Sequence, residues 1–113
     1  MNSVTVFDGA PGTTVTFTAS ADSAYSLTAM GATLLDLNGK MAIMILISIE
    51  TNSARIAFKA DASETLGYLR EAGQGFQITG GNALNELTIA NAAAGSNFTA
   101  QITPFFSNVP SLT

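Results

Sequence analysis

The chain has 113 residues, a length that suits a single domain built around one hydrophobic core. Hydrophobic residues make up 47% of the chain and charged residues only 11%, far below the roughly 25% usual for soluble domains. The four Lys and Arg against eight Asp and Glu give a net charge of −4, which argues against binding to nucleic acid or to an anionic membrane surface. The sequence contains neither Cys nor His, which excludes thiolate and imidazole chemistry.

Apolar and polar residues alternate with a period of two along much of the chain, a pattern typical of half-buried β-strands. The segments with this alternation are residues 3–6, 13–20, 25–28, 33–37, 54–59, 76–79, 84–91 and 97–103. Gly, Asn, Asp and Pro separate them, and Asn38-Gly39 is a strong hairpin signal. We therefore predict short antiparallel strands joined by tight turns.

Two segments depart from simple alternation. Residues 41–49 are apolar on both faces, which predicts a central strand covered on both sides. This run is about half as long as a membrane-spanning helix needs to be. Residues 60–73 are the only helical candidate, but Gly67 and Gly73 weaken the pattern, so we expect a loop or one short turn there.

About eight short strands without long helices predict an all-β, antiparallel β-sandwich with a jelly-roll-like arrangement. We expect one domain over residues 1–113, in which residues 1–20 form an edge-strand arm. Pro104 has no backbone N–H to donate, so it is expected to end the last strand. Residues 104–113 would then form an apolar C-terminal tail.

The sequence offers little support for a catalytic or metal site. The carboxylates are scattered beside predicted turns, so we interpret them as loop residues that aid solubility rather than as an acid–base pair. Asp61 and Glu64 carry oxygen ligands of the kind that calcium prefers, but their spacing fits no EF-hand loop. A serine nucleophile would need Lys40 or Lys59 as its base, and both are expected to be solvated. We predict no catalytic, cofactor-binding or metal-binding residues, and no enzymatic activity.

Arg55 is the charged residue that stands out. It lies within a predicted strand next to the most apolar segment, and its expected partner is Glu50, across the turn at residues 51–53. Two interpretations remain open: an ion pair within one sheet, or an anchor for a contact between subunits.

Residues 45–58 read ILISIETNSARIAF. This stretch resembles a core of the type ILISVETN-x-x-R-x-x-F in small structural proteins encoded near the head genes of tailed bacteriophages. Further matching pieces follow in order at residues 66–69, 72–73, 76–78, 89–92, 95–97 and 102–105. The resemblance covers roughly residues 41–106, and the loop at residues 60–65 is shorter than in that family.

The resemblance implies a capsid decoration or cement protein with a jelly-roll-like sandwich, bound outside the viral shell. The expected partners are the major capsid protein and further copies of the chain, as a homodimer or homotrimer. The expected location is the capsid exterior of the virion, after synthesis in the host cytoplasm. No nucleic acid, membrane or cofactor is expected to take part.

The alternative is a tail- or fibre-associated module that binds a receptor or carbohydrate. Such a module needs exposed aromatic rings, and Tyr25 and Tyr68 are the only tyrosines in a chain without Trp. For the decoration protein, the residues predicted to contact other chains are apolar or cationic and lie in the first strands, beside the central strand or in the tail. They are Val4, Val6, Val15, Phe17, Arg55, Phe105, Phe106, Val109 and Leu112.

Overall fold

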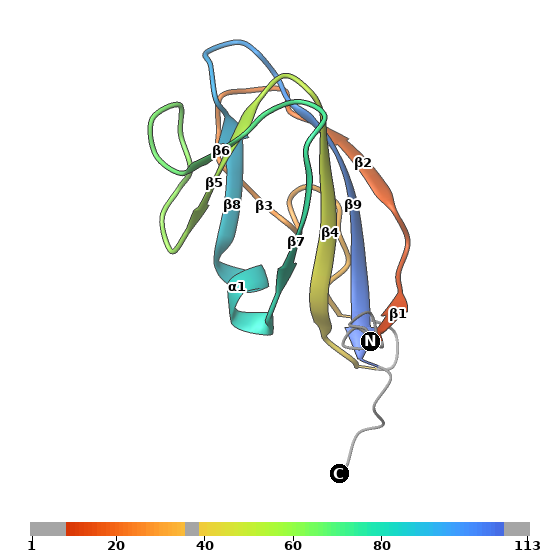
Figure 1. The fold of residues 1–113 in the computed structure, drawn as a ribbon. Coiled ribbons are helices and arrows are strands. Elements are labelled where there is room, and N and C mark those ends of the chain that lie inside the picture. Colours follow the sequence, from red (N-terminus) through yellow and green to blue (C-terminus); the bar gives the residue numbers. More distant parts are fainter. Residues whose placement is uncertain (1–8, 36–38, 108–113) are drawn as a thin grey trace, which may run out of the picture.

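The computed structural model describes residues 9–35 and 39–107, and their strands form two antiparallel sheets that pack face to face (Figure 1). The first sheet, sheet A, contains β1 (Gly9–Pro11), β2 (Val15–Thr18), β4 (Ala42–Thr51), β7 (Gly75–Thr79) and β9 (Thr99–Ser107). Sheet B contains β3 (Tyr25–Ser26), β5 (Ala54–Phe58), β6 (Tyr68–Arg70) and β8 (Leu87–Asn91). One short helix, α1 (Gly81–Glu86), precedes β8 in this described part of the chain. The predicted all-β sandwich is confirmed.

The order of the strands is that of a jelly roll. β1 and β2 both pair with β9, so they act as two halves of one interrupted strand. Counted in this way, sheet A has the order β1/β2-β9-β4-β7 and sheet B the order β3-β8-β5-β6. Two Greek keys wrapped across a pair of sheets give this alternation of strands between the sheets.

The core lies between the two sheets. On β4, alternate residues Ile45, Ile47 and Ile49 are fully buried and face sheet B. Leu27, Leu87, Ile89, Phe98 and Ile102 meet them from other parts of the fold and are equally buried. Apolar side chains that alternate along each strand thus close one core, as the period-two pattern predicted.

The outer face of β4 is covered only in part: Met44 on that face is 2% exposed but Leu46 is 47% exposed, so the prediction that both faces of this strand are buried is wrong at Leu46. Leu46 is exposed on that face, beside Thr103 of β9 and Gln77 of β7. The described chain supplies only two layers, and sheet B covers only the inner side of sheet A. The apolar run therefore reflects a central position in the sheet, between β9 and β7, rather than burial from both sides.

Hydroxyl and amide side chains occupy the outer face of sheet A beside β4. The Thr16 hydroxyl donates to the side-chain oxygen Oε1 of Gln101 at 2.8 Å, and further cross-strand side-chain pairs are Thr14 with Thr103 and Thr18 with Thr99. Such pairs stabilise neighbouring strands without charge. They explain how a chain with so few charged residues covers this face with polar groups.

Pro104 does not end the last strand, contrary to the prediction. It lies opposite Ile45 of β4, and its carbonyl accepts a hydrogen bond from the Gly12 nitrogen at 2.7 Å on the other side of β9. Because the N–H and C=O of a strand residue point to the same side, the missing N–H faces the break between β1 and β2. The β4–β9 ladder loses no donor, so β9 continues to Ser107 and includes the first part of the predicted tail.

Two other segments differ from the predicted pattern. Residues 60–67 form the predicted loop, in which the Ser63 hydroxyl accepts the backbone N–H groups of Thr65 and Leu66, but Tyr68–Arg70 then form the strand β6, which was not predicted. The strand predicted at residues 84–91 begins only at Leu87, because the preceding residues form α1. This helix places Leu84 in the core.

Some predicted segments fall wholly or partly outside the described residues. The strand at residues 3–6 is one, and Asn38 of the predicted hairpin turn is another. On either side of that turn, Leu35 and Met41 form an isolated antiparallel bridge, and the Ala42 nitrogen donates to the Leu34 carbonyl.

Candidate interaction surface

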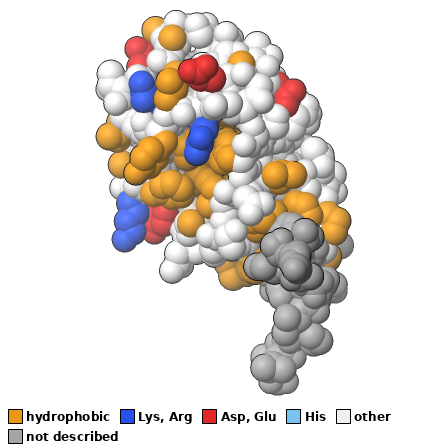
Figure 2. Space-filling view, in the orientation of Figure 1, with side chains coloured by type: hydrophobic (Ala, Val, Ile, Leu, Met, Phe, Trp, Pro, Cys, Tyr) orange, Lys and Arg blue, Asp and Glu red, His pale blue; other side chains and the backbone are white. Residues whose placement is uncertain are grey.

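The flank of the sandwich formed by β5, β6 and the loop between them carries a group of exposed apolar side chains. Figure 2 shows hydrophobic side chains gathered on the left of the molecule, where Figure 1 draws these strands. Tyr68 is 71% exposed, Leu66 49%, Leu69 43% and Phe58 40%. Grouped apolar residues of this kind mark candidate binding surfaces, whereas single ones are ordinary. None of the four was among the predicted contact residues of a decoration protein, although Tyr68 was considered for the alternative, a receptor- or carbohydrate-binding module.

An unpaired stretch of sheet edge lies within this surface. β5 extends to Phe58, whereas β6 pairs only with residues 54–56, the last pair being Ile56 with Tyr68. The Lys59 nitrogen donates to the Glu86 carbonyl on the β8 side. Backbone groups alternate sides along a strand, so the N–H and C=O of Phe58 point the other way, past the end of β6. Among the described residues, sheet B therefore has a free edge at Phe58.

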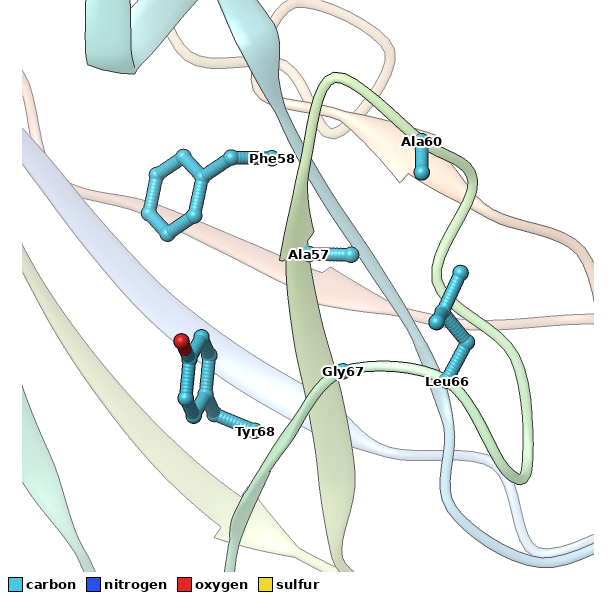
Figure 3. A pocket seen from close by; sticks show the side chains of 6 residues that line it. All are labelled: Ala57, Phe58, Ala60, Leu66, Gly67 and Tyr68. Atoms are coloured by element: carbon cyan, nitrogen blue, oxygen red, sulfur yellow. The ribbon is translucent and has the colours of Figure 1, made fainter.

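A hollow of about 430 Å³ surrounds this free edge. We call it the edge hollow, and its lining residues are Ala57, Phe58, Ala60, Leu66, Gly67 and Tyr68. Figure 3 shows the rings of Phe58 and Tyr68 on one side of β5 and the side chains of Ala57, Ala60 and Leu66 on the other. Because side chains from both faces of the sheet line it, the hollow is the space that a further strand beside β5 would occupy.

The loop that walls the edge hollow is fixed by two side chains of sheet B. The Thr88 hydroxyl donates to the Ala60 carbonyl at 2.9 Å and accepts from the Ala62 nitrogen at 2.9 Å. Arg55 donates from Nε to the Glu64 carbonyl at 2.9 Å and from Nη1 to a second carbonyl of the loop at 3.0 Å. These four hydrogen bonds hold the loop against the outer face of the sheet.

This arrangement corrects the prediction for Arg55 and Glu50. The two residues lie in different sheets, because β4 ends at Thr51 in sheet A and β5 begins at Ala54 in sheet B. The Glu50 carboxylate accepts a hydrogen bond from the Ser48 hydroxyl, and Arg55 binds loop carbonyls instead. An ion pair between them within one sheet is therefore wrong, and a role for Arg55 between subunits stays a prediction.

Gly67 immediately precedes β6 and sets the point at which that strand begins. Its φ angle is 121°, and a Cβ at this position would lie 2.8 Å from the backbone oxygen of Ile56. Only glycine combines this backbone angle with so close an approach. The chain can therefore enter sheet B abruptly at Tyr68, which leaves the edge of β5 beyond Ile56 unpaired by β6.

A second, smaller hollow opens between the two sheets and adjoins the first at Phe58 and Tyr68. We call it the inter-sheet slot; its volume is about 140 Å³, and its lining residues are Ile56, Phe58, Tyr68, Arg70, Phe76, Gln77 and Ile78. The Arg70 guanidinium lies 5.2 Å from the centre of the Phe76 ring, within the range of a cation–π contact. Its Nε is buried and has no hydrogen-bond partner among the described residues.

The predicted contact residues lie mostly elsewhere. Val15 and Phe17 are half-buried and pack against the core, and the Phe17 ring lies 4.8 Å from that of Tyr25. Phe106 is buried in the core, whereas Phe105 is half-buried on the other face of β9. Burial leaves the Phe106 side chain little surface to offer another chain. Four predicted contact residues lie outside the described ranges: Val4, Val6, Val109 and Leu112.

A polar network at Asn91 has a structural role. Asn91 is 1% exposed, and its side-chain nitrogen donates to Asp22 Oδ1 at 2.8 Å, while the Gly95 nitrogen donates to the same carboxylate. The hydrogen bond from Asn91, and then that from Gly95, hold the pKa of Asp22 below its ordinary value, although desolvation acts in the opposite direction. The network ties loops from distant parts of the sequence together and opens into neither hollow.

Within residues 9–35 and 39–107, no group of three or more acidic residues is close enough together to hold a metal ion. In the same residues, no helix is both long and apolar enough to cross a membrane. Comparison of the chain with models of known protein families, with curated proteins and with solved structures gave no significant match. Among the hollows of the described residues, the edge hollow and the inter-sheet slot are the two that the exposed rings of Phe58 and Tyr68 line together.

Proposed function

We propose that this chain is a structural protein that acts by binding other proteins, as a decoration or cement protein on the outside of a viral capsid. The observation that carries the proposal is the exposed apolar surface around the free edge of β5, on a compact jelly-roll sandwich with very few charges. The resemblance of residues 45–58 to phage head proteins supplies the viral setting.

The low charge favours this role for a physical reason. Burying an unpaired charge against another protein costs several kcal/mol, whereas a hydroxyl that keeps a hydrogen bond costs far less. The outer face of sheet A is covered by threonine and glutamine pairs, and the β5–β6 flank is apolar. Both surfaces can be desolvated against a protein lattice at little cost.

Cementing follows from mass action. A protein that binds only the assembled shell stabilises that state over free subunits. Repeated contacts at symmetry-related positions add avidity, so single contacts can be weak. In this proposal the partners are the major capsid protein and further copies of the chain, as a homodimer or homotrimer, and no step requires a catalytic residue.

The proposal is tested by quantitative mass spectrometry of purified virus particles that carry this chain. The expected result is a ratio to the major capsid protein of one, or of a simple fraction of one. Particles that lack the chain should also lose their contents at a lower temperature. Absence of the chain from particles would refute the proposal. A few copies per particle would indicate that the chain belongs to the tail and not to the capsid.

A receptor- or carbohydrate-binding module is the second candidate. Tyr68 favours it, because this ring is 71% exposed and lies beside Phe58, as a platform for stacking a sugar would. Tyr25 cannot serve in the same way, since its ring packs against Phe17 and Phe98. A glycan array distinguishes the two candidates: binding that is lost in Tyr68→Ala would support the module, and absence of binding would leave the cement protein.

A further inference from the structure

We propose that the free edge of β5 binds an extended segment of a partner protein, and that this segment carries an acidic side chain directed at Arg70. The inference rests on the proposed function, because it names the kind of capsid-protein segment that the β5–β6 flank would receive. The segment would pair with Phe58 as an added strand of sheet B, in line with β6. Three independent features of the described residues lead to this assignment.

The first feature is the backbone of Phe58. Its N–H and C=O point past the end of β6, into the edge hollow. Strand addition supplies such groups with partners, and the main-chain hydrogen bonds give affinity without regard to sequence. Since one residue offers only one pair of hydrogen bonds here, side-chain contacts must provide the rest.

The second feature is the apolar lining on both sides of that backbone. Figure 3 shows the Phe58 and Tyr68 rings on one side of β5 and Leu66 on the other. Successive side chains of an added strand point to opposite faces of the sheet. One apolar side chain of the segment would therefore lie against Leu66, and the next residue would point toward the two rings and the inter-sheet slot.

The third feature is Arg70. It is the one charged side chain that lines either hollow in the part of the chain that the structure describes. Its guanidinium makes no hydrogen bond to a described residue, and its Nε is shielded from water as well. A buried donor without an acceptor is costly, and a carboxylate satisfies a guanidinium better than any neutral group. The slot therefore favours an acidic residue over a basic or purely apolar one.

The experiment is a selection of random octapeptides, displayed on particles, against the purified full-length chain. The best-enriched peptide is then synthesised in two forms, with its acidic residue and with the corresponding amide. Binding of both is measured by titration of the ¹⁵N-labelled chain, which also maps the contact. The variants are Arg70→Gln and Tyr68→Ser, and Leu46→Ser is the matched control, because it removes an exposed apolar side chain from sheet A.

We expect the enriched peptides to combine β-branched or apolar residues with one Asp or Glu. The amide form of the peptide and the Arg70→Gln variant should each weaken binding about 10-fold, because a charge-assisted hydrogen bond is lost. Tyr68→Ser should weaken binding as well, and Leu46→Ser should not. Amide shifts should be largest at Phe58 and in residues 66–70.

The inference is overturned if no peptide is enriched, if acidic and amide peptides bind equally, or if the shifts lie on sheet A. Failure of this inference and failure of the proposed function can be told apart. If the chain binds the peptide but is absent from virus particles, strand binding at the edge hollow is supported and the cement role is refuted. If the Arg70→Gln/Tyr68→Ser double variant joins particles as well as the wild type does, the cement role is supported. Binding of a partner segment at the edge hollow is then refuted.

Discussion

The side-chain amide of Asn91 donates a 2.8 Å hydrogen bond to the carboxylate of Asp22, although the two residues are 69 positions apart in the sequence. Asn91 also donates to Asn97 Oδ1 and accepts a hydrogen bond from the Phe98 nitrogen at 3.0 Å. Asn97 in turn accepts, at its backbone oxygen, a hydrogen bond from the Asn52 side chain. One buried amide thus joins three connections between strands at this end of the sandwich.

Replacing Asn91 by alanine should destabilise the fold by about 2–4 kcal/mol, because it leaves the buried Phe98 nitrogen without its acceptor and Asp22 without a donor. Urea unfolding followed by circular dichroism measures the change. Asn82→Ala is the matched control, since Asn82 is exposed on α1, and it should change stability by less than about 0.5 kcal/mol. Equal effects of the two substitutions would show that the network contributes nothing specific.

The same network predicts a dependence of stability on pH. Hydrogen bonds from Asn91 and Gly95 lower the pKa of Asp22 in the folded state. A lowered folded pKa gives stability that is present above the unfolded pKa of about 4 and is lost as the pH falls through the folded value. The wild type should therefore be more stable than Asp22→Asn at pH 7, and the difference should shrink below pH 4.

Unfolding free energies of both proteins at several pH values between neutral and strongly acidic test this prediction. Asp61→Asn serves as the control for removal of one negative charge, because the exposed Asp61 carboxylate makes no hydrogen bond to a described residue. A difference between wild type and Asp22→Asn that stays constant with pH would contradict the assigned cause.

Gly67→Ala should destabilise the protein by more than about 2 kcal/mol, since it combines a positive φ with a Cβ that meets the Ile56 backbone. Two glycines separate these causes. Gly73 has a φ of 93° and open space around it, so Gly73→Ala reports the backbone angle alone, at about 1 kcal/mol. Gly81→Ala, inside α1 with no close neighbour, should be neutral or stabilising. If all three variants unfolded alike, close contact at Gly67 would not fix the start of β6.

The strands could be predicted from the sequence where burial differs between the two faces of a strand. Val15 and Phe17 pack toward the core while Thr16 and Thr18, which alternate with them, are exposed, and this difference is what period-two alternation records. Alternation does not report how many layers cover a sheet, so Leu46 was wrongly expected to be buried. The helix α1 was missed because its six residues contain too few positions to show a helical period.

The candidate surface could not be predicted, because it arises from pairing rather than from composition. Phe58 and Tyr68 line the same hollow because the pairing of β6 with β5 stops at Tyr68 and Ile56. The sequence around Tyr68 contains no signal that predicts the register of β6 against β5. Glu50 and Arg55 illustrate the opposite error: their closeness in sequence suggested a pair, but the turn between them carries the chain from one sheet to the other.

Arg55 and Glu50 provide a direct test of that correction. Arg55→Met keeps most of the alkyl chain and removes the hydrogen bonds to the Glu64 and Gly67 carbonyls, so it should cost about 1–3 kcal/mol. Glu50→Gln should change stability by less than about 0.5 kcal/mol, because Glu50 is exposed and contacts only Ser48 among the described hydrogen-bond partners.

Hydrogen exchange locates the effect of Arg55→Met. The loop amides of residues 63–67 should lose protection in this variant. Within the described chain, Arg55 and Thr88 are the two residues of sheet B whose side chains hydrogen-bond to the backbone of that loop. Protection of β4 should not change. If instead Glu50→Gln were as destabilising as Arg55→Met, and the double variant no worse than either, the two residues would be coupled. The original prediction of an ion pair between Arg55 and Glu50 would then be correct.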